Sequence, residues 1–355
     1  MIRLTRENCL RSFILNEAKI LIIGAGALGI TCAYHLQLGG AKISFLVRPN
    51  RVDALSRPQK LYCYNDHSIK LLEGYRVFTD ASELQGQHFD FVMLTLDGAT
   101  CRSAEGVALL SGVGKALAGT GSNLVICGVG IGLYEHVRDT TGFAENNLLE
   151  GSMKMFAYQV GRPNAPQPSS NVELHDSADI AFLSFPDRIG FFLANRPKQS
   201  AQAFAQAWKN SGVALCKLMP PKVYATFSNT FFPFTVACEL TGWNGTDALV
   251  NNREMWQLCC DAQREIMGLK QHGFMGKIFS WLMNNAKLEK MMRDMERTAA
   301  PMGFTQFNRF HHGGKVLEQD VQIMANCAAA GEQQGRDMSA VNKLLALWRE
   351  RNATR

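Results

Sequence analysis

The stretch KILIIGAGALG, residues 19–29, joins an apolar, strand-like run to a glycine-rich turn, and a helix-like segment follows it. Its glycines have the G-x-G-x-x-G spacing of a dinucleotide-binding turn. Gly24 lets the chain turn off the strand, Gly26 lets the backbone approach a pyrophosphate, and Gly29 lets the helix pack closely on the strand. We therefore predict a Rossmann-type α/β domain. The residues of this turn expected to contact the dinucleotide are Gly24, Ala25, Gly26, Ala27, Leu28 and Gly29.

The end of the next strand indicates which dinucleotide binds. Residues 42–47 have the pattern of that strand, and Arg48-Pro49-Asn50-Arg51 follows without the acidic residue that would bind the ribose hydroxyls of NAD. Guanidinium groups suit a 2′-phosphate, and a charge-assisted hydrogen bond of about 1.5–3 kcal/mol would favour NADP(H) roughly ten- to a hundredfold. The alternative is that Arg48 and Arg51 are ordinary solvated loop charges. NADP(H) is the predicted cofactor.

Strand and helix patterns alternate through the first half of the chain. Residues 89–96 and 123–127 read as buried strands, and a second glycine-rich turn, residues 128–132, follows the latter. In a doubly wound sheet, ligands bind beyond the carboxyl ends of the strands. The loops after these two strands should therefore face the cofactor and the substrate, with Leu96 and Gly130 among the cofactor contacts.

The second half changes character. Short β-like runs such as residues 180–183 predict antiparallel additions to the sheet edge, and from Pro220 the pattern is helical almost to the end, with about six helices. We predict two domains. Residues 1–218 form the dinucleotide-binding domain with a short N-terminal extension, and residues 219–355 form a helical substrate and dimerisation domain.

Composition excludes several other classes of protein. The chain has 355 residues and a net charge of +6 from scattered basic residues, so we expect no nucleic-acid partner. No apolar run approaches the roughly 18 residues of a membrane span. The ten cysteines show no C-x-x-C pair and no metal-ligand spacing with the eight histidines. We therefore expect a cytoplasmic protein with reduced thiols, no metal and no membrane contact, and a homodimer is possible.

Several motifs resemble those of the ketopantoate reductase family over roughly residues 18–350. They are the GAGALG opening, the arginine that closes the second strand, LTLDG at 94–98, the glycine turn at 130–132, ELTGWNG at 239–245 and GKVLEQD at 314–320. The resemblance implies NADPH-dependent reduction of a 2-oxo acid to a 2-hydroxy acid. Its reference reaction is 2-dehydropantoate (ketopantoate) to pantoate, in pantothenate biosynthesis. It also implies an all-α C-terminal domain like that of 6-phosphogluconate dehydrogenase.

The family's catalytic lysine begins the first helix of the C-terminal domain, with polar residues one and two turns further on. Lys222 is the only lysine at this place, and Thr226 with Asn229 or Thr230 would share its helix face. The chemistry needs such a donor, because negative charge develops on the carbonyl oxygen, which must then be protonated. This alignment makes Lys222 the catalytic acid, and Thr226 and Asn229 substrate contacts.

A second alignment of the same helix starts from Pro233, which matches a proline of the family. It places Tyr224 at the lysine position and Ser228 at an asparagine position. The two alignments differ by two residues, and the sequence leaves both open.

The resemblance assigns roles to further residues of the helical half. Asn244 matches a substrate-binding asparagine, and Glu318 matches a glutamate near the substrate and the lysine. A substrate-binding serine of the family falls at Thr305 or Gln306. Simpler roles are also open, because Asn244 precedes a glycine in a turn and Glu318 is a first-turn helix acid.

Two positions depart from the family pattern near the cofactor. Asp97 stands where the family commonly has a lysine, and Val129 stands where an asparagine helps to hold the nicotinamide. A relative that reduces another or a bulkier 2-oxo acid fits these departures. The competing hypotheses are a non-catalytic NADP-binding sensor or partner protein, and an opine- or hydroxyacid-type dehydrogenase.

Overall fold

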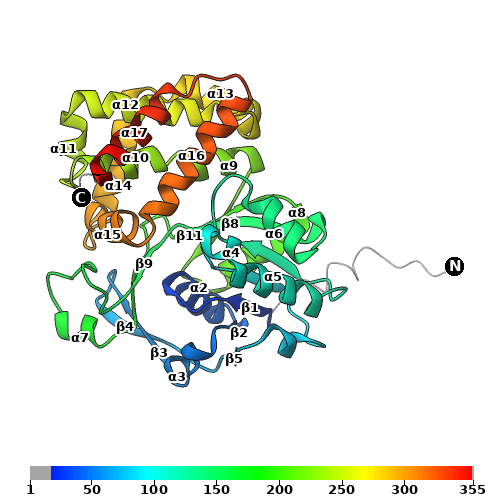
Figure 1. Ribbon diagram of the computed structural model, residues 1–355. Helices are drawn as coiled ribbons and strands as arrows, with labels where there is room; N and C mark the ends of the chain where they lie inside the picture. The colour runs from blue at the N-terminus through cyan, green and yellow to red at the C-terminus, as the bar shows by residue number, and fades with distance from the viewer. Residues whose placement is uncertain (1–16, 354–355) are drawn as a thin grey trace.

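The structure, a computed structural model, describes residues 17–353 and has an α/β domain followed by a helical domain (Figure 1). This is the fold class that the sequence predicts. The predicted N-terminal extension lies, but for its last residue, outside the described part of the chain. The last strand of the α/β domain ends at Met219, and the first helix of the helical domain begins at Pro221.

The main sheet has eight strands in the order β12-β11-β8-β7-β6-β1-β2-β5. Its strands are β1 (Lys19–Ile23), β2 (Lys42–Leu46), β5 (Arg76–Phe78), β6 (Phe91–Leu94), β7 (Asn123–Ile126), β8 (Leu148–Met153), β11 (Ile189–Ala194) and β12 (Leu215–Met219). Neighbours from β5 to β8 are parallel, whereas β11 runs antiparallel to β8. Residues 180–183, expected as an antiparallel addition to the edge of this sheet, instead form β10 of a second sheet, where they run antiparallel to β9 (Phe156–Gln159).

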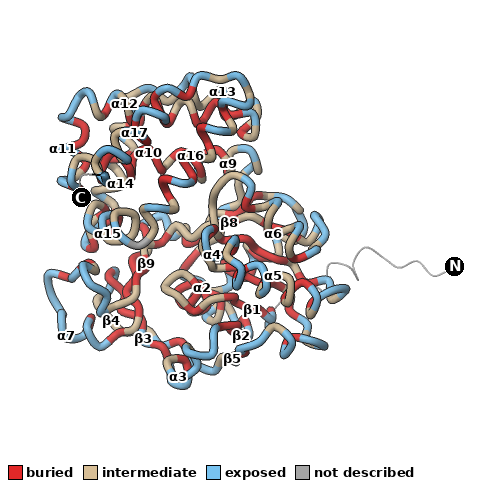
Figure 2. The backbone as a smooth tube through the Cα atoms, viewed as in Figure 1, coloured by how far each residue is buried: buried red, intermediate tan, exposed pale blue. Residues whose placement is uncertain are grey.

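Helices cover both faces of this sheet, as a parallel sheet requires. Ile20 and Ile22 of β1 pack in one cluster with the side chains of α2 (Ala27–Leu38) and α8 (Lys198–Asn210). Leu21 and Ile23 point to the other face, toward α5 (Ala104–Ala116) and α6 (Leu133–Thr141). All four β1 side chains are fully buried, which explains the uninterrupted apolar run in the sequence (Figure 2).

A second, four-stranded sheet, β4-β3-β10-β9, lies across α2 from the main sheet. Its strands are β3 (Gln59–Cys63), β4 (Ser68–Leu72), β9 (Phe156–Gln159) and β10 (Ile180–Leu183). β9 contacts α2 and continues the chain from β8, so the small sheet forms one side of the region between the domains (Figure 1). The remaining short helices of the α/β domain are α3 (Val52–Leu55), α4 (Gly98–Arg102) and α7 (Val172–Asp176).

The helical domain is built around α10, in which every residue except the last is buried. Its described residues form nine α-helices: α9 (Pro221–Asn229), α10 (Phe232–Leu240), α11 (Thr246–Asn251), α12 (Arg253–Met267), α13 (Gly273–Leu282), α14 (Asn285–Thr298), α15 (Phe304–Phe310), α16 (Leu317–Gln333) and α17 (Ser339–Ala353). The sequence suggested about six. Two of the additional boundaries are asparagine caps, because the Asn252 and Asn284 side chains accept hydrogen bonds from the first turns of α12 and α14. None of the helices between residues 17 and 353 is both long and apolar enough to cross a membrane.

Candidate active site

A cleft of about 1740 Å³ lies between the two domains. One wall consists of the start of α2 and the loops that follow β6 and β7, and the opposite wall consists of α9, α15 and the first turn of α16. β8 and β9 form the floor that joins the two walls. Cofactor loops and helical domain thus face each other across one continuous space.

The glycine-rich turn has the geometry that a dinucleotide needs. Gly24 has φ +101°, and a side chain on Gly29 would lie 2.2 Å from the Gly24 carbonyl oxygen, so both positions require glycine. Around Gly26 a Cβ atom would meet nothing within 4 Å, and no side chain caps the N-terminus of α2 there. This turn therefore leaves open space beside uncapped N–H groups, which fits a pyrophosphate. Ala27 and Leu28 line the cleft.

The two arginines after β2 lie beside this turn. Arg51 donates a hydrogen bond from Nη2 to the carbonyl oxygen of Ala25 at 3.3 Å, which holds its guanidinium next to the glycine turn. Arg48 is exposed at the start of the short 3₁₀ helix Pro49–Arg51. Both cations are therefore available near the place where the adenosine ribose of a dinucleotide binds in such folds.

The two residues that depart from the family pattern, Asp97 and Val129, lie in the loops after β6 and β7. Asp97 lines the cleft but caps α4, because its Oδ1 accepts a hydrogen bond from the Thr100 N–H at 2.7 Å. Leu96 and Val129 also line the cleft, and Val129 packs against the core cluster of the helical domain. Gly130 has φ +126°, and a Cβ there would lie 3.2 Å from Ile323 of α16, so this turn touches the helical domain directly.

Helix α9 presents Lys222 away from the cleft. The Lys222 ammonium donates a hydrogen bond to the Gln271 carbonyl oxygen at 3.0 Å, and its stem lies against Gly273. Thr226 bonds back to the Lys222 carbonyl oxygen, and Asn229 contacts His272 at 3.1 Å. The structure brings Lys222, Thr226 and Asn229 together as one stripe, as their spacing predicts, but none of them lines the cleft in the described part of the chain.

Tyr224 and Ser228, the residues of the second alignment, do line the cleft. Tyr224 is 4% exposed, and its hydroxyl makes no hydrogen bond to any described residue. Burial raises the pKa of Tyr224, and the nearby hydroxyls of Ser152 and Ser228 partly oppose this effect although neither has the geometry of a hydrogen bond to the phenol oxygen. A buried hydroxyl without a partner is uncommon, and here it is available to a ligand.

Three other residues suggested by the family pattern lie outside the cleft as the described residues define it. Asn244 is exposed and donates to the Thr241 carbonyl oxygen at 2.9 Å, as expected of a turn residue. Thr305 bonds to the Glu296 carboxylate at 2.8 Å, and Glu318 is exposed on the first turn of α16. Gln306, the alternative to Thr305, does line the cleft.

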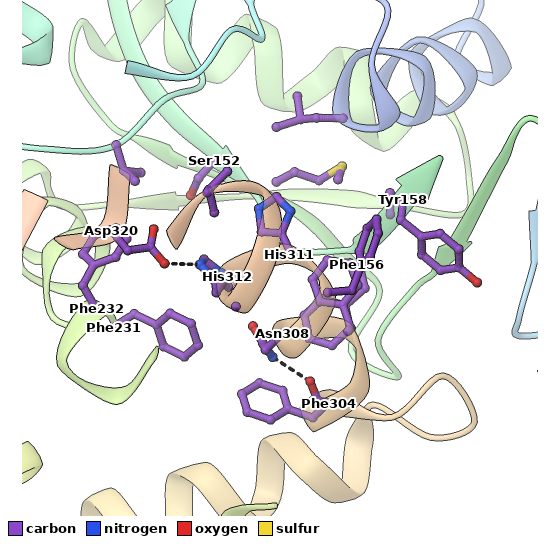
Figure 3. A pocket seen from close by; sticks show the side chains of 18 of the residues that line it. Ser152, Phe156, Tyr158, Phe231, Phe232, Phe304, Asn308, His311, His312 and Asp320 are labelled. Atoms are coloured by element: carbon purple, nitrogen blue, oxygen red, sulfur yellow. Dashed lines mark hydrogen bonds and ion pairs between the residues drawn. The ribbon is translucent and has the colours of Figure 1, made fainter. Parts of the chain in front are cut away.

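The sequence analysis missed a pair of titratable residues in the cleft. His312 Nδ1 lies 2.7 Å from the Oδ2 atom of Asp320, and both residues line the cleft (Figure 3). His312 belongs to a π-helical turn, His311–Lys315, closed by a hydrogen bond from Val316 N–H to the His311 carbonyl oxygen. Such turns often occur at functional sites. The adjacent histidines and glycines were the only sequence signal.

Aromatic rings form one side of the cleft (Figure 3). Phe156 of β9 stacks on Phe307 of α15, with ring centroids 4.1 Å apart and an interplanar angle of 9°. Phe304 and Phe231 join the same group. This wall suits a bulky apolar group better than a small polar one. Within residues 17–353, no group of histidine, cysteine and acidic side chains could hold a metal ion.

Comparisons with known proteins agree with this architecture. Residues 20–170 match the family model for ketopantoate reductase PanE/ApbA. No curated protein matches the sequence. Among solved structures, 2-dehydropantoate 2-reductase from Geobacter metallireducens GS-15 is 16% identical, with a TM-score of 0.68 over 94% of this chain and 99% of that chain.

Two further solved structures show the same fold. A complex of D-mandelate dehydrogenase with NADH and anilino(oxo)acetate is 13% identical, with a TM-score of 0.63 over 95% of this chain and 98% of that chain. The dimeric ketopantoate reductase from Staphylococcus aureus is 14% identical, with a TM-score of 0.61 over 94% and 98%. At sequence identities this low, the similarity to these structures establishes a common fold and nothing more. The chain therefore resembles the ketopantoate reductase family over residues 20–170 and shares the fold of its solved members over nearly its whole length.

Proposed function

We propose that the protein is an NADPH-dependent reductase that converts a 2-oxo acid to a 2-hydroxy acid, with ketopantoate to pantoate as the reference reaction. The observation that carries this proposal is a cleft between the domains, in which Ala27 and Leu28 of the glycine turn and the loops after β6 and β7 face polar side chains of the helical domain. When bound, reduced nicotinamide supplies the hydride. The chain would bind the pyrophosphate at the uncapped start of α2 and hold the substrate between the two walls.

The preference for NADPH rests on the arginines after β2. Arg51 is fixed next to the glycine turn by its bond to Ala25, and Arg48 is exposed nearby. No acidic side chain stands at the end of β2 to bind the ribose hydroxyls of NADH. These two cations would bind the 2′-phosphate of NADPH.

The aromatic wall favours a second candidate substrate, a 2-oxo acid with a large apolar or aromatic side chain. The stacked rings of Phe156 and Phe307 extend an apolar surface along the cleft, and these rings offer no hydrogen-bond partner for a hydroxyl group such as that of ketopantoate. The likeness in fold to a dehydrogenase that was solved with anilino(oxo)acetate agrees with this candidate.

The decisive experiment follows NADPH absorbance with ketopantoate and with a panel of small, branched and aromatic 2-oxo acids, and repeats each assay with NADH. Turnover of ketopantoate would support the reference reaction, and turnover of aromatic acids alone would support the second candidate. Tight NADPH binding without turnover of any acid would contradict the reductase and favour a sensor. A requirement for an amine co-substrate would indicate an opine-type dehydrogenase.

We also propose that the protein works in the cytoplasm and forms a homodimer. The nine described cysteines are all free thiols, which agrees with a reducing compartment. Phe274 and Trp281 on α13 are 76% and 83% exposed, and apolar side chains of this size are rarely left in solvent together. Light scattering of the purified protein measures the oligomeric state, and a monomer at micromolar concentration would contradict the dimer.

A further inference from the structure

His312 and Asp320 form a buried ion pair at the helical wall of the cleft. The side chain of Asp320 is 1% exposed, whereas that of His312 is 16% exposed. His312 lines the cleft. Figure 3 shows the imidazole between Asp320 and the open centre of the pocket. The pair thus connects a buried negative charge with the space in which a substrate would bind.

The contact with Asp320 determines which nitrogen of His312 can act on a ligand. Nδ1 is occupied by Asp320 Oδ2, so it must carry a proton that it donates to the carboxylate. Nε2 has no hydrogen bond to any described atom, and it is the nitrogen at which the ring gains or loses its proton. This is the arrangement in which a carboxylate fixes the tautomer and orientation of a catalytic histidine.

Within residues 17–353, the Asp320 carboxylate has few polar partners besides His312. The second carboxylate oxygen of Asp320, Oδ1, is buried without a hydrogen-bond partner among the described residues. Burial raises the pKa of Asp320, and the imidazole of His312 and the hydroxyl of Thr235 oppose this effect. The contact with His312 is thus the main polar interaction of this buried carboxylate.

The surroundings of His312 hold the ring in place. The His312 ring makes a T-shaped contact with the Phe231 ring, with centroids 5.5 Å apart. It makes a second T-shaped contact with the His311 ring, with centroids 4.8 Å apart. The next residue, Gly313, comes so close to Trp243 that a Cβ atom would lie 2.6 Å from the indole nitrogen. That indole donates a hydrogen bond to the carboxylate of Glu239 at 2.8 Å. The other charged groups on the elements packed against the turn are Arg309 on α15, and Glu318 and the distant Glu332 on α16.

We propose that His312, oriented by Asp320, is the proton donor of the reduction, in place of the lysine that the family pattern suggests. This inference rests on the proposed function. As hydride reaches C2 of the 2-oxo acid, the C2 oxygen gains the electron pair of the carbonyl bond and takes the proton from Nε2 of His312. The imidazole is left neutral, still donating from Nδ1 to Asp320, and regains a proton from solvent through the cleft. Hydride and proton together convert the ketone into the alcohol.

The test compares three variants of the full-length protein with the wild type. His312→Gln removes the proton donor, and Asp320→Asn keeps the shape but removes the charge that orients it. His88→Gln is the matched control, because His88 faces Asp90 in an exposed pair, with Nε2 3.6 Å from Oδ1, outside the cleft. For each protein we would measure NADPH binding by fluorescence, and kcat and KM as functions of pH with the best 2-oxo acid.

We expect His312→Gln to lower kcat by about a hundredfold or more, the usual contribution of a general acid, with NADPH binding unchanged. The decrease of kcat at high pH that marks the acid in the wild type should disappear in this variant. Asp320→Asn should also lower kcat, and His88→Gln should match the wild type. In a fourth variant, His312→Ala, added imidazole should restore part of the rate.

The contradicting outcomes separate the two proposals. A wild type that reduces a 2-oxo acid, together with a His312→Gln variant whose kcat stays within about threefold and keeps its pH profile, would overturn the role of His312 alone. A wild type that binds NADPH but reduces no 2-oxo acid would overturn the proposed function and this role with it. If His312→Gln loses NADPH binding through misfolding, Asp320→Asn decides, because unchanged kcat and pH profile in that variant would overturn the inference.

Discussion

Lys222 and Tyr224 lie on the same first turns of α9 but face opposite sides of it. The ammonium of Lys222 is bound to the Gln271 carbonyl oxygen, whereas Tyr224 lines the cleft with an unpartnered hydroxyl. Residues two apart on a helix differ by about 200° around its axis, so only one of them can face the substrate. We therefore propose the alignment that starts from Pro233.

Tyr224→Phe should therefore affect activity and stability in opposite directions. Loss of a hydrogen bond to substrate worth about 0.5–1.5 kcal/mol would lower kcat/KM by up to about tenfold. The free energy of unfolding should stay constant or rise by up to about 1 kcal/mol, because a buried hydroxyl without a partner is removed. Steady-state kinetics and urea unfolding measure the two effects. A loss of activity in Lys222→Met with none in Tyr224→Phe would instead support the lysine alignment.

Arg51→Ala should weaken NADPH binding by about ten- to a hundredfold and leave NADH binding nearly unchanged, because only NADPH carries the 2′-phosphate. Fluorescence titration with both cofactors measures the two dissociation constants. Arg57→Ala is the matched control, since Arg57 is bound to Asp179, whereas Arg51 is bound to Ala25 of the glycine turn. Equal weakening of both cofactors by Arg51→Ala would show that the arginine merely supports the glycine turn.

Phe307→Leu should lower specificity for aromatic 2-oxo acids. The ring of Phe307 stacks on Phe156, and an aromatic pair contributes about 0.5–1.5 kcal/mol beyond its buried area. We expect KM for an aromatic acid to rise by up to about tenfold, with a smaller effect on a short aliphatic acid. Phe274→Leu, the same substitution at an exposed position of α13, should change neither value. An equal effect on all acids would contradict a specificity role for the wall.

The sequence was most informative where the chemistry is local. The turn at Gly24–Gly29 could be recognised because atoms close in the chain or in the adjoining strands leave no room for a side chain at Gly24 and Gly29, and the fold class followed from it. The side of α9 that faces the cleft depends on how the helix packs against the rest of the domain. The presence of Lys222 in its first turn therefore did not indicate which residues line the cleft. His312 lies in a π-helical turn that leads into α16, and this turn brings its ring to Asp320. Residue types alone do not indicate such a turn.

His35 should make the protein less stable in acid. Its ring is buried between Phe182 and Trp208, and Nδ1 bonds to the Thr31 carbonyl oxygen at 2.9 Å. Burial lowers the pKa of His35 from 6.5 to about 4, so between these values the unfolded chain binds a proton that the folded protein does not. The stability contributed by the neutral ring is therefore complete above pH 6.5 and is lost as pH falls toward 4. The loss is about 3 kcal/mol at 1.36 kcal/mol per pKa unit.

Urea unfolding of the wild type and of His35→Phe at pH values between 7.5 and 4.5 measures this contribution. The variant keeps an aromatic ring against Trp208 but cannot take up a proton, so its unfolding free energy should fall less steeply with decreasing pH. His88→Gln, at an exposed histidine, should retain the wild-type slope. If His35→Phe and the wild type lost stability in parallel down to pH 4.5, the acid sensitivity would have to come from other groups, because a buried neutral imidazole cannot be removed without removing its share of the slope.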